Sequence, residues 1–391
     1  MTRSRALGTA VLVCSTLCAS MLVAQAPGIR DSADVRIVEN ASRASAPVTF
    51  RLGAKRLEVG GLEDNPGLEF DHNQGYLRGA LLADGGLAVI DVSRVHFFDA
   101  KGTRRAVVGR LGSGPEDFRY LMGVCRVSGD TIAVYDSHNK RVSLLTTNAK
   151  IVHTFQLEPN WSTPFEQCYG DGTLLFTRSV PAAATEPVQT HQFFRTTARG
   201  EKVGREFTLT SRRFDMVSSM GVDYTAGGAD LLYADARTQD IRSYNSEGKL
   251  RRIIRTRDVP AAVTAAQAES RMTGSIPNNV SAAEREERMA RMKARPYAST
   301  WPTYLTVKSD PAGRTWAEDY PVPSTSMNRW TAFDRNGRMI GRLMLGTLPG
   351  DARPPQVISF GENVVLLRRR DTDGAAYLSV YAIDAVDAPK R

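Results

Sequence analysis

Histidine and serine are the first side chains to consider for metal binding or nucleophilic catalysis, and their spacing in this sequence favours neither. The five histidines form no His-x-x-x-His cluster of the kind that binds zinc. They are His72, His96, His138, His153 and His191. No Gly-x-Ser-x-Gly nucleophile motif occurs. We therefore expect neither a zinc site nor a serine hydrolase, whereas a calcium site of scattered oxygen ligands stays open, because one sequence hides such ligands.

Two cysteines, Cys125 and Cys168, follow the first 26 residues. Each falls where an inner strand of a repeat unit is expected to begin. In an exported protein, a disulfide or two buried thiols are more plausible than a thiol nucleophile. A Cys125–Cys168 bridge is thus one alternative, and it requires adjacent strands to bring the two Cα atoms within about 7 Å.

Two tryptophans and two methionines are the candidates for ligand contact. Trp161 and Trp301 lie in predicted loops near prolines, where an indole can stack on a sugar or another flat ligand. Met289 and Met292 lie three residues apart on one face of a predicted helix and offer an adaptable apolar surface. We treat all four as candidate ligand-binding residues and assign no catalytic residue.

A repeat of 45 to 50 residues positions these side chains. Its unit is a polar turn, a β-rich run that ends in aspartate, a short turn, a second β-rich run and a glycine turn. Asp91 and Asp136 end the first runs of two successive units 45 residues apart, and Asp235 follows 99 residues later. Periods of this length with several short strands are typical of propeller blades. The sequence predicts an all-β fold, a β-propeller of six blades, with seven as the alternative.

The last repeat lacks an outer strand, so the N-terminus is expected to complete it. Residues 27–78 form an N-terminal segment with two β-rich runs, Val35–Val38 and Arg56–Val59. Because a propeller must close into a ring, we expect one of these runs to be the ring-closing strand. Residues 79–391 then form the blades.

The linker between the first two units resembles that of the NHL-type propellers. Residues 109–118, with the sequence GRLGSGPEDF, are similar to the family's interblade pattern Gly-x-x-Gly-x-Gly-Pro-Gly-Glu-Phe, with Glu116-Asp117 in place of Gly-Glu. Asp136 and Arg141 match the family's Asp-turn-Arg hairpin and are expected to form a turn cap and a cross-strand ion pair. The resemblance, closest to exported bacterial six-bladed propellers, implies a fold and export and says little about activity.

Residues 261–299 interrupt the repeat between the predicted blades four and five. Residues 261–272 and 282–295 are rich in Ala and Glu and indicate two helices, with Ser281 and Glu284 placed for a capping box. This helical insertion is either a decoration on the edge of the ring or a lid over one mouth of its channel.

Residues 1–26 are typical of a cleaved signal peptide. Arg3 and Arg5 precede an apolar stretch, and Ala24 and Ala26 supply the small residues of a cleavage site. No later run is long and apolar enough for a transmembrane helix. We expect a secreted or periplasmic protein that is monomeric.

The formal net charge of +9 is scattered along the chain, with a dense run at Arg368–Arg370 that we interpret as solvated strand edges and loops. The alternative is a patch for anionic envelope polymers or lipid headgroups. An exported protein rarely meets nucleic acid, so that partner class is not expected. The leading hypothesis is a binding module for a small molecule, glycan or protein, without catalysis or cofactor. The alternative hypothesis is a metal-dependent propeller hydrolase or lyase, similar to a lactonase.

Overall fold

The structure, a computed structural model, describes residues 28–61, 77–158, 161, 168–181, 188–212, 222–235, 238–294, 297–321 and 327–386. The predicted signal peptide and His72 lie outside these residues. Within them, the strands form five hydrogen-bonded sheets.

The first three sheets follow the order of the chain and are antiparallel. The first contains β4 (Arg78–Leu81), β5 (Leu87–Ile90), β6 (Val95–Phe98) and β7 (Arg104–Val108). The second contains β8 (Leu121–Ser128), β9 (Thr131–Asp136), β10 (Arg141–Thr146) and β11 (Ile151–Gln156). The third contains β12 (Leu174–Val180), β13 (Val188–Thr196) and β14 (Lys202–Arg212).

The last two sheets include strands from the N-terminus. The fourth contains β15 (Val222–Gly227), β16 (Asp230–Asp235), β17 (Asp240–Tyr244) and β18 (Leu250–Thr256), then β2 (Val35–Asn40) and β1 (Gly28–Ser32). The fifth begins with β19 (Tyr304–Ser309), β20 (Thr315–Asp319), β21 (Asn328–Phe333) and β22 (Met339–Leu345). It continues through β3 (Thr49–Gly60) to β25 (Ala376–Val386), β24 (Val364–Arg370) and β23 (Gln356–Phe360). A short 3₁₀ helix, η1 (Arg43–Ser45), precedes β3.

β3 ties the N-terminal segment to the C-terminal strands. It pairs antiparallel with β25 along its whole length and in parallel with β22 near its beginning. The run Arg56–Val59 belongs to β3 and therefore lies beside the last strands of the chain. The run Val35–Val38 belongs to β2, which pairs in parallel with β18 of the fourth sheet. Of the two N-terminal runs, only Arg56–Val59 completes the last group of strands.

Turns of the sequence Asp-x-x-Gly connect consecutive antiparallel strands at four places. In each, the glycine N–H donates to the aspartate carbonyl, at 2.9 to 3.2 Å, and the glycine has a φ between 77° and 90°. The turns begin at Asp99, Asp310, Asp334 and Asp371. Glycine takes this left-handed conformation without the steric cost that a Cβ brings. At Gly337 a Cβ would also lie 3.0 Å from Ile254 of the fourth sheet, so a tight packing contact adds to the conformational reason.

Most of the core lies between sheets. One apolar cluster joins the first and second sheets, with Ala88 and Ile132 among its members, and further clusters join the second to the third, the third to the fourth and the fourth to the fifth. Within the fifth sheet, a cluster packs β20, β21 and β22 against β23 and β24. Another joins the first sheet to β3, β24 and β25, where Val89 packs with Val59. Middle strands such as β5 and β6 are wholly buried, whereas outer strands such as β7 are exposed. Successive sheets that each pack on the next, with the last on the first, make a β-propeller, as the repeat predicts.

The linker at residues 109–118 has the fixed form that its glycines predict. Gly109 has a φ of 95°, and Phe118 is fully buried between the first two sheets. Asp136 caps its turn as predicted, accepting hydrogen bonds from the backbone N–H groups of Arg119, Tyr120, His138 and Asn139. The expected ion pair to Arg141 is absent from the contacts of the described residues. Arg141 instead donates to the carbonyls of Gly114 and Asp117 and so holds the linker.

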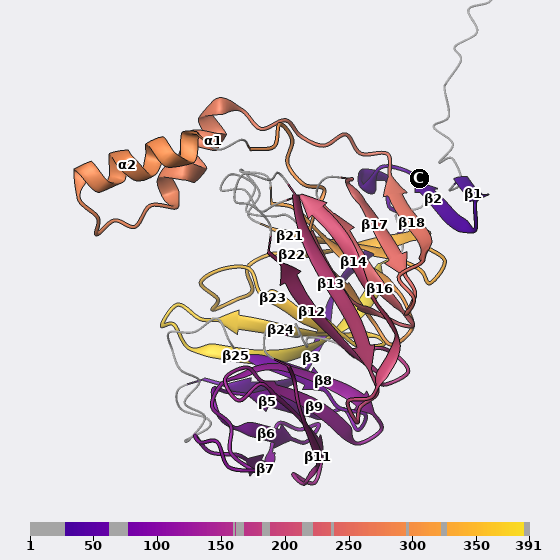
Figure 1. Ribbon diagram of the computed structural model, residues 1–391, viewed down its shortest axis with the longest axis vertical. Helices are drawn as coiled ribbons and strands as arrows, with labels where there is room; N and C mark the ends of the chain where they lie inside the picture. The colour runs from indigo at the N-terminus through magenta and orange to yellow at the C-terminus, as the bar shows by residue number, and fades with distance from the viewer. Residues whose placement is uncertain are drawn as a thin grey trace, which may run out of the picture.

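Two helices occupy the stretch between β18 and β19, and we call residues 257–303 the helical segment. α1 (Ala265–Gly274) and α2 (Ala282–Lys293) stand out to one side of the sheets (Figure 1). Ser281 accepts from the Glu284 N–H at 3.2 Å, which is half of the expected capping box, while Glu284 pairs with Arg288. The complete box lies at the start of α1, where Thr264 and Gln267 bond reciprocally.

Candidate functional site

A cavity of about 340 Å³, the arginine cavity, opens at the end of the molecule where inner strands begin. It is lined by Leu77, Leu305, Glu318, Asn328, Arg353, Pro354, Gln356, Arg368, Arg369, Arg370 and Ala376. Leu77 directly precedes β4, Leu305 lies at the start of β19, and Gln356 begins β23. β19 contacts β23, and β23 contacts β4. Because all three inner strands begin at this end, the cavity lies at one mouth of the central channel.

The lining of the arginine cavity is strongly basic. It contains four arginines and a single carboxylate, Glu318, which is buried. Arg353 is exposed, and its side chain makes no hydrogen bond or ion pair within the part of the chain that the structure describes. An anion that enters the cavity would therefore meet an excess of positive charge near partly buried groups, where screening by water is weaker than at an open surface.

Arg369 is fixed by two carboxylates from different parts of the chain. Its guanidinium donates to Asp351 at 2.8 and 3.1 Å and to Glu58 of β3 at 2.5 Å. Burial alone would lower the pKa of Arg369, but the hydrogen bond and charge of Asp351, with Glu58 nearby, raise it. Burial alone would raise the pKa of Glu58, but hydrogen bonds from Lys55 and Ser379 hold it below its usual value. Arg369 therefore stays protonated, and Asp351 and Glu58 balance its charge. It forms a rigid part of the cavity wall.

Arg368 and Arg370 are positioned by contacts to the cavity rim. Arg368 donates to the side chain of Gln356 and to the Leu77 carbonyl, and Arg370 donates to the Gly374 carbonyl at 3.1 Å. Both are half-buried. The interpretation of this arginine run as solvated strand edges is therefore wrong. The run lines a cavity because β24 ends at the channel mouth.

Three of the four predicted ligand-contact residues gather in one apolar cluster of the helical segment. Trp301 packs with Ala268 and Met272 of α1, and Met289 and Met292 of α2 lie partly buried against the same cluster. Trp301 is 1% exposed, and its ring stacks on Tyr320 with the ring centroids 5.5 Å apart. The indole thus anchors the helices to the fifth sheet, and in this state it offers no open face for stacking.

Trp161, the fourth predicted ligand-contact residue, lies in a different cluster and is also buried, with 2% of its surface exposed. Phe194 meets it edge-on at 4.3 Å between ring centroids, and the Arg178 guanidinium lies 4.4 Å from its ring. Both contacts occupy ring surface that a flat ligand would need. Trp161 and Trp301 are loop residues, as predicted, but the chain packs them inward.

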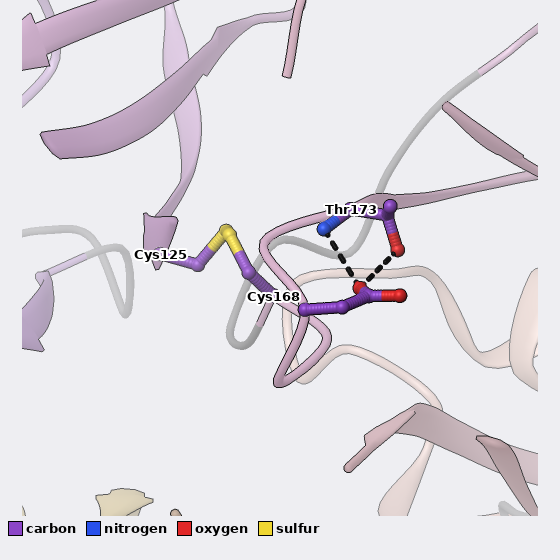
Figure 2. Close-up of a disulfide and its surroundings, with 4 residues drawn as sticks. Cys125, Cys168 and Thr173 are labelled. Atoms are coloured by element: carbon purple, nitrogen blue, oxygen red, sulfur yellow. Dashed lines mark hydrogen bonds between the residues drawn. A yellow bond between two sulfur atoms is a disulfide. The ribbon is translucent and has the colours of Figure 1, made fainter. Parts of the chain in front are cut away.

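Cys125 and Cys168 form a disulfide, with their Cα atoms 5.4 Å apart. Figure 2 shows Cys125 on its strand and Cys168 on the loop that leads to Thr173. The same loop is fixed by Asp171, which accepts from the N–H and hydroxyl of Thr173 at 3.0 and 2.7 Å. Of the two alternatives for the cysteines, the structure has the bridge. It links β8 of the second sheet to the beginning of the third.

The described histidines are dispersed, and each has a local role. His96 is buried and bonds Asp91 at 2.9 Å, while His138 stacks on Tyr120 and His153 bonds the Arg199 carbonyl. Burial lowers the pKa of His191. In the described part of the chain, no group of three or more His, Cys, Asp or Glu side chains is placed to hold a metal ion.

Sequence reasoning missed most of the arginine cavity. Its residues come from β19, β20, β21, β23, β24, β25 and the loop before β23, which lie within about 70 residues, and from the distant Leu77 before β4. The one signal was the density of arginine, at Arg353 and in the run Arg368–Arg370. Strand periodicity alone could not place these groups on one rim, because that depends on how the two halves of the fifth sheet pack against each other.

No model of a known protein family matches the chain, and no curated protein matches it in sequence. Among solved structures, a Bacteroides fragilis protein described as exported is 11% identical with a TM-score of 0.50, over 90% of this chain and 99% of that one. A Bacteroides vulgatus member of the DUF4221 family is 10% identical with a TM-score of 0.47, over 87% and 99%. Regucalcin, a calcium-binding protein of Agrobacterium tumefaciens, is 11% identical with a TM-score of 0.37, over 85% and 96%. The likeness to the first is one of fold alone. None of the described helices is long and apolar enough to cross a bilayer.

Proposed function

We propose that this chain is an exported β-propeller that binds a small anionic ligand in the arginine cavity. One observation carries the proposal: four arginines from two neighbouring elements line a cavity whose lining holds a single carboxylate. Arginine presents a planar fork of donors that matches carboxylate and phosphate groups. A ligand with two or more such groups suits this lining best.

The arginines would have different roles in binding. Arg369, neutralised by Asp351 and Glu58, fixes the shape of the wall. Arg353 extends from the loop before β23, exposed and without an ion pair among the described residues, so it would meet the ligand first. Asn328 and Gln356 add amide groups for orientation. The proposal is a binding function without an assigned catalytic residue.

The propeller is proposed to have six blades. Three blades are the first three sheets, a fourth is β15 to β18, a fifth is β19 to β22, and the sixth is β23, β24, β25 and β3. The apolar clusters between successive groups, including the one that joins the last group to the first, support this count. On this view β3 closes the ring, and the helical segment is an insertion between blades four and five.

Export is the proposed route to the site of action. A disulfide such as Cys125–Cys168 persists in oxidising compartments, which include the periplasm and the exterior of the cell. The cleaved signal peptide at residues 1–26 and the NHL type of the blades are parts of this proposal, as is a monomeric state.

Charge reversal at the cavity rim tests the binding function. We expect citrate, a tricarboxylate, to raise the melting temperature of the wild type at low salt, since a ligand that binds only the folded state stabilises it. The Arg353→Glu variant should lose most of this shift, because the cavity becomes less basic while no described hydrogen bond or ion pair of the Arg353 side chain is lost. Added sodium chloride should reduce the effect in the wild type. Thermal unfolding monitored by tryptophan fluorescence measures the citrate shift of the wild type, that of the variant and the effect of salt.

Arg104→Glu is the matched control, because Arg104 is exposed on β7, away from the cavity, and the net charge changes equally. Citrate should stabilise this variant as it does the wild type. An equal citrate shift in both variants would mean that the anion acts through net charge. No shift with citrate, phosphate or pyrophosphate in the wild type would refute the proposed function.

A further inference from the structure

A second cavity, of about 170 Å³, lies where the helical segment leaves and rejoins the propeller. Residues 259–261 and 301–303 form its outer wall, and these two stretches are held together by the Trp301 N–H, which donates to the Ala261 carbonyl at 2.8 Å. We call it the neck cavity. Its inner wall is the end of β20 and the start of β21, which contribute Asp319 and Arg329.

The neck cavity is separate from the arginine cavity. Glu318 and Asn328 line the arginine cavity, whereas the next residues along the same strands, Asp319 and Arg329, line the neck cavity. Successive side chains of a strand point to opposite faces of a sheet. The hairpin of β20 and β21 therefore divides the two cavities.

Within the described residues, one positive charge of the neck cavity has no ionic partner. Arg43 pairs with Asp258 at 2.9 Å and with Asp319 at 2.8 Å, and Asp319 also pairs with Arg342. The Arg329 side chain, by contrast, makes no hydrogen bond or ion pair with any described residue, and its Nε is buried without an acceptor. A buried donor without an acceptor costs stability, so this guanidinium is a site prepared for an anion.

About half of the surface of the neck cavity is apolar. Pro260, Pro302, Pro321, Val259 and Met327 supply this part, and buried Trp301 also belongs to the wall, its Nε1 lacking an acceptor among the described residues. Prolines and methionine favour the body of a hydrophobic ligand rather than a second charge. An apolar cavity of about 150 Å³ is large enough for one benzene ring.

We infer that the neck cavity binds a small apolar monocarboxylate, with its carboxylate on Arg329 and its hydrocarbon body against the prolines and Met327. This inference goes beyond the proposed function, which concerns a multiply charged ligand in the other cavity. Because both ends of the helical segment form the outer wall, a bound acid would also hold the helices to the fifth sheet.

Benzoate is the probe for this site, and ligand-detected NMR titration of the full chain is the readout. We expect benzoate to bind the wild type and to bind the Arg329→Gln variant at least tenfold more weakly. Arg329→Lys, which keeps the charge and loses the planar fork, should give an intermediate affinity. Since the Arg329 side chain makes no hydrogen bond or ion pair with a described residue, neither variant should melt below the wild type in the absence of ligand.

Three controls make the outcome decisive. Benzyl alcohol, with the ring but not the charge, and acetate, with the charge but not the ring, should each bind far more weakly than benzoate. Arg353→Glu should leave benzoate binding unchanged, and Arg329→Gln should leave the citrate shift unchanged, so the two proposals fail separately. The inference is overturned if benzoate does not bind the wild type, if it binds Arg329→Gln equally well, or if Arg353→Glu abolishes its binding.

Discussion

The substitution Val59→Asp is expected to lower the free energy of unfolding by about 3 to 5 kcal/mol, the usual cost of an unpaired charge in a core. Val59 lies on β3, is 1% exposed and packs with Val89 and Phe98 of the first sheet and Leu378 of β25. An aspartate there places a carboxylate in the contact between the last group of strands and the first. Urea unfolding followed by tryptophan fluorescence measures the loss.

Ile29→Asp provides the matched control, because it introduces the same charge on β1, an outer strand where Ile29 is 39% exposed. We expect a change within about 0.5 kcal/mol, as for most surface substitutions. The contrast compares β3, which contacts the first sheet, with an N-terminal strand at the edge of the fourth sheet. Equal unfolding midpoints for Val59→Asp and the wild type would mean that the contact between β3 and the first sheet does not contribute to stability.

Loss of the disulfide is expected to cost about 4 kcal/mol in the chain-entropy account, because the bridge joins residues 43 apart in sequence. In the double variant Cys125→Ala/Cys168→Ala, the loop before β12 would lose its covalent link to β8. Its described backbone contacts to the neighbouring sheet include the bond from the Gly170 N–H to the Gly228 carbonyl at 2.7 Å. The melting temperature should fall by on the order of 5 to 10 °C.

Dithiothreitol supplies the control for this prediction. The reductant should lower the melting temperature of the wild type toward that of the double variant and leave the variant itself unchanged. If the variant melts with the wild type under oxidising conditions, the bridge does not stabilise the junction between the second and third sheets.

The repeating part of the fold could be predicted because each unit carries its own local rules. Aspartates such as Asp136 cap the turn that follows their strand, and glycines such as Gly102 and Gly337 take a left-handed conformation in the hairpins. These features recur at a fixed period and need no knowledge of distant contacts. The β-propeller architecture follows from them.

The contacts between distant segments could not be predicted in the same way. The runs Val35–Val38 and Arg56–Val59 have equal strand character, and only pairing with β18 or β25 tells them apart. Arg141 was expected to pair with its cross-strand partner Asp136, but the linker carbonyls of Gly114 and Asp117 are closer to its guanidinium. Pairing preferences between facing residues of two strands take no account of a loop, such as the linker at residues 109–118, that packs back onto β10.

The candidate site was predicted least well, for a related reason. Trp301 has the sequence context of an exposed loop residue, but α1 packs over it and Tyr320 lies beneath it. The arginine run at Arg368–Arg370 has the sequence of a solvated strand end, but β19 and β20, from the other half of the fifth sheet, supply Leu305 and Glu318 to the same cavity. Whether a polar side chain meets solvent or a cavity is decided by the adjacent blade.

The most direct test of the anion-binding account is a crystal of the full chain soaked in sodium tungstate, a tetrahedral dianion with a strong anomalous signal. The account predicts an anomalous peak inside the arginine cavity, within contact distance of Arg353 and Arg370, and the loss of that peak in Arg353→Glu crystals. Tungstate peaks found only at surface arginines outside the cavity, with none against Arg353 or Arg370, would contradict it.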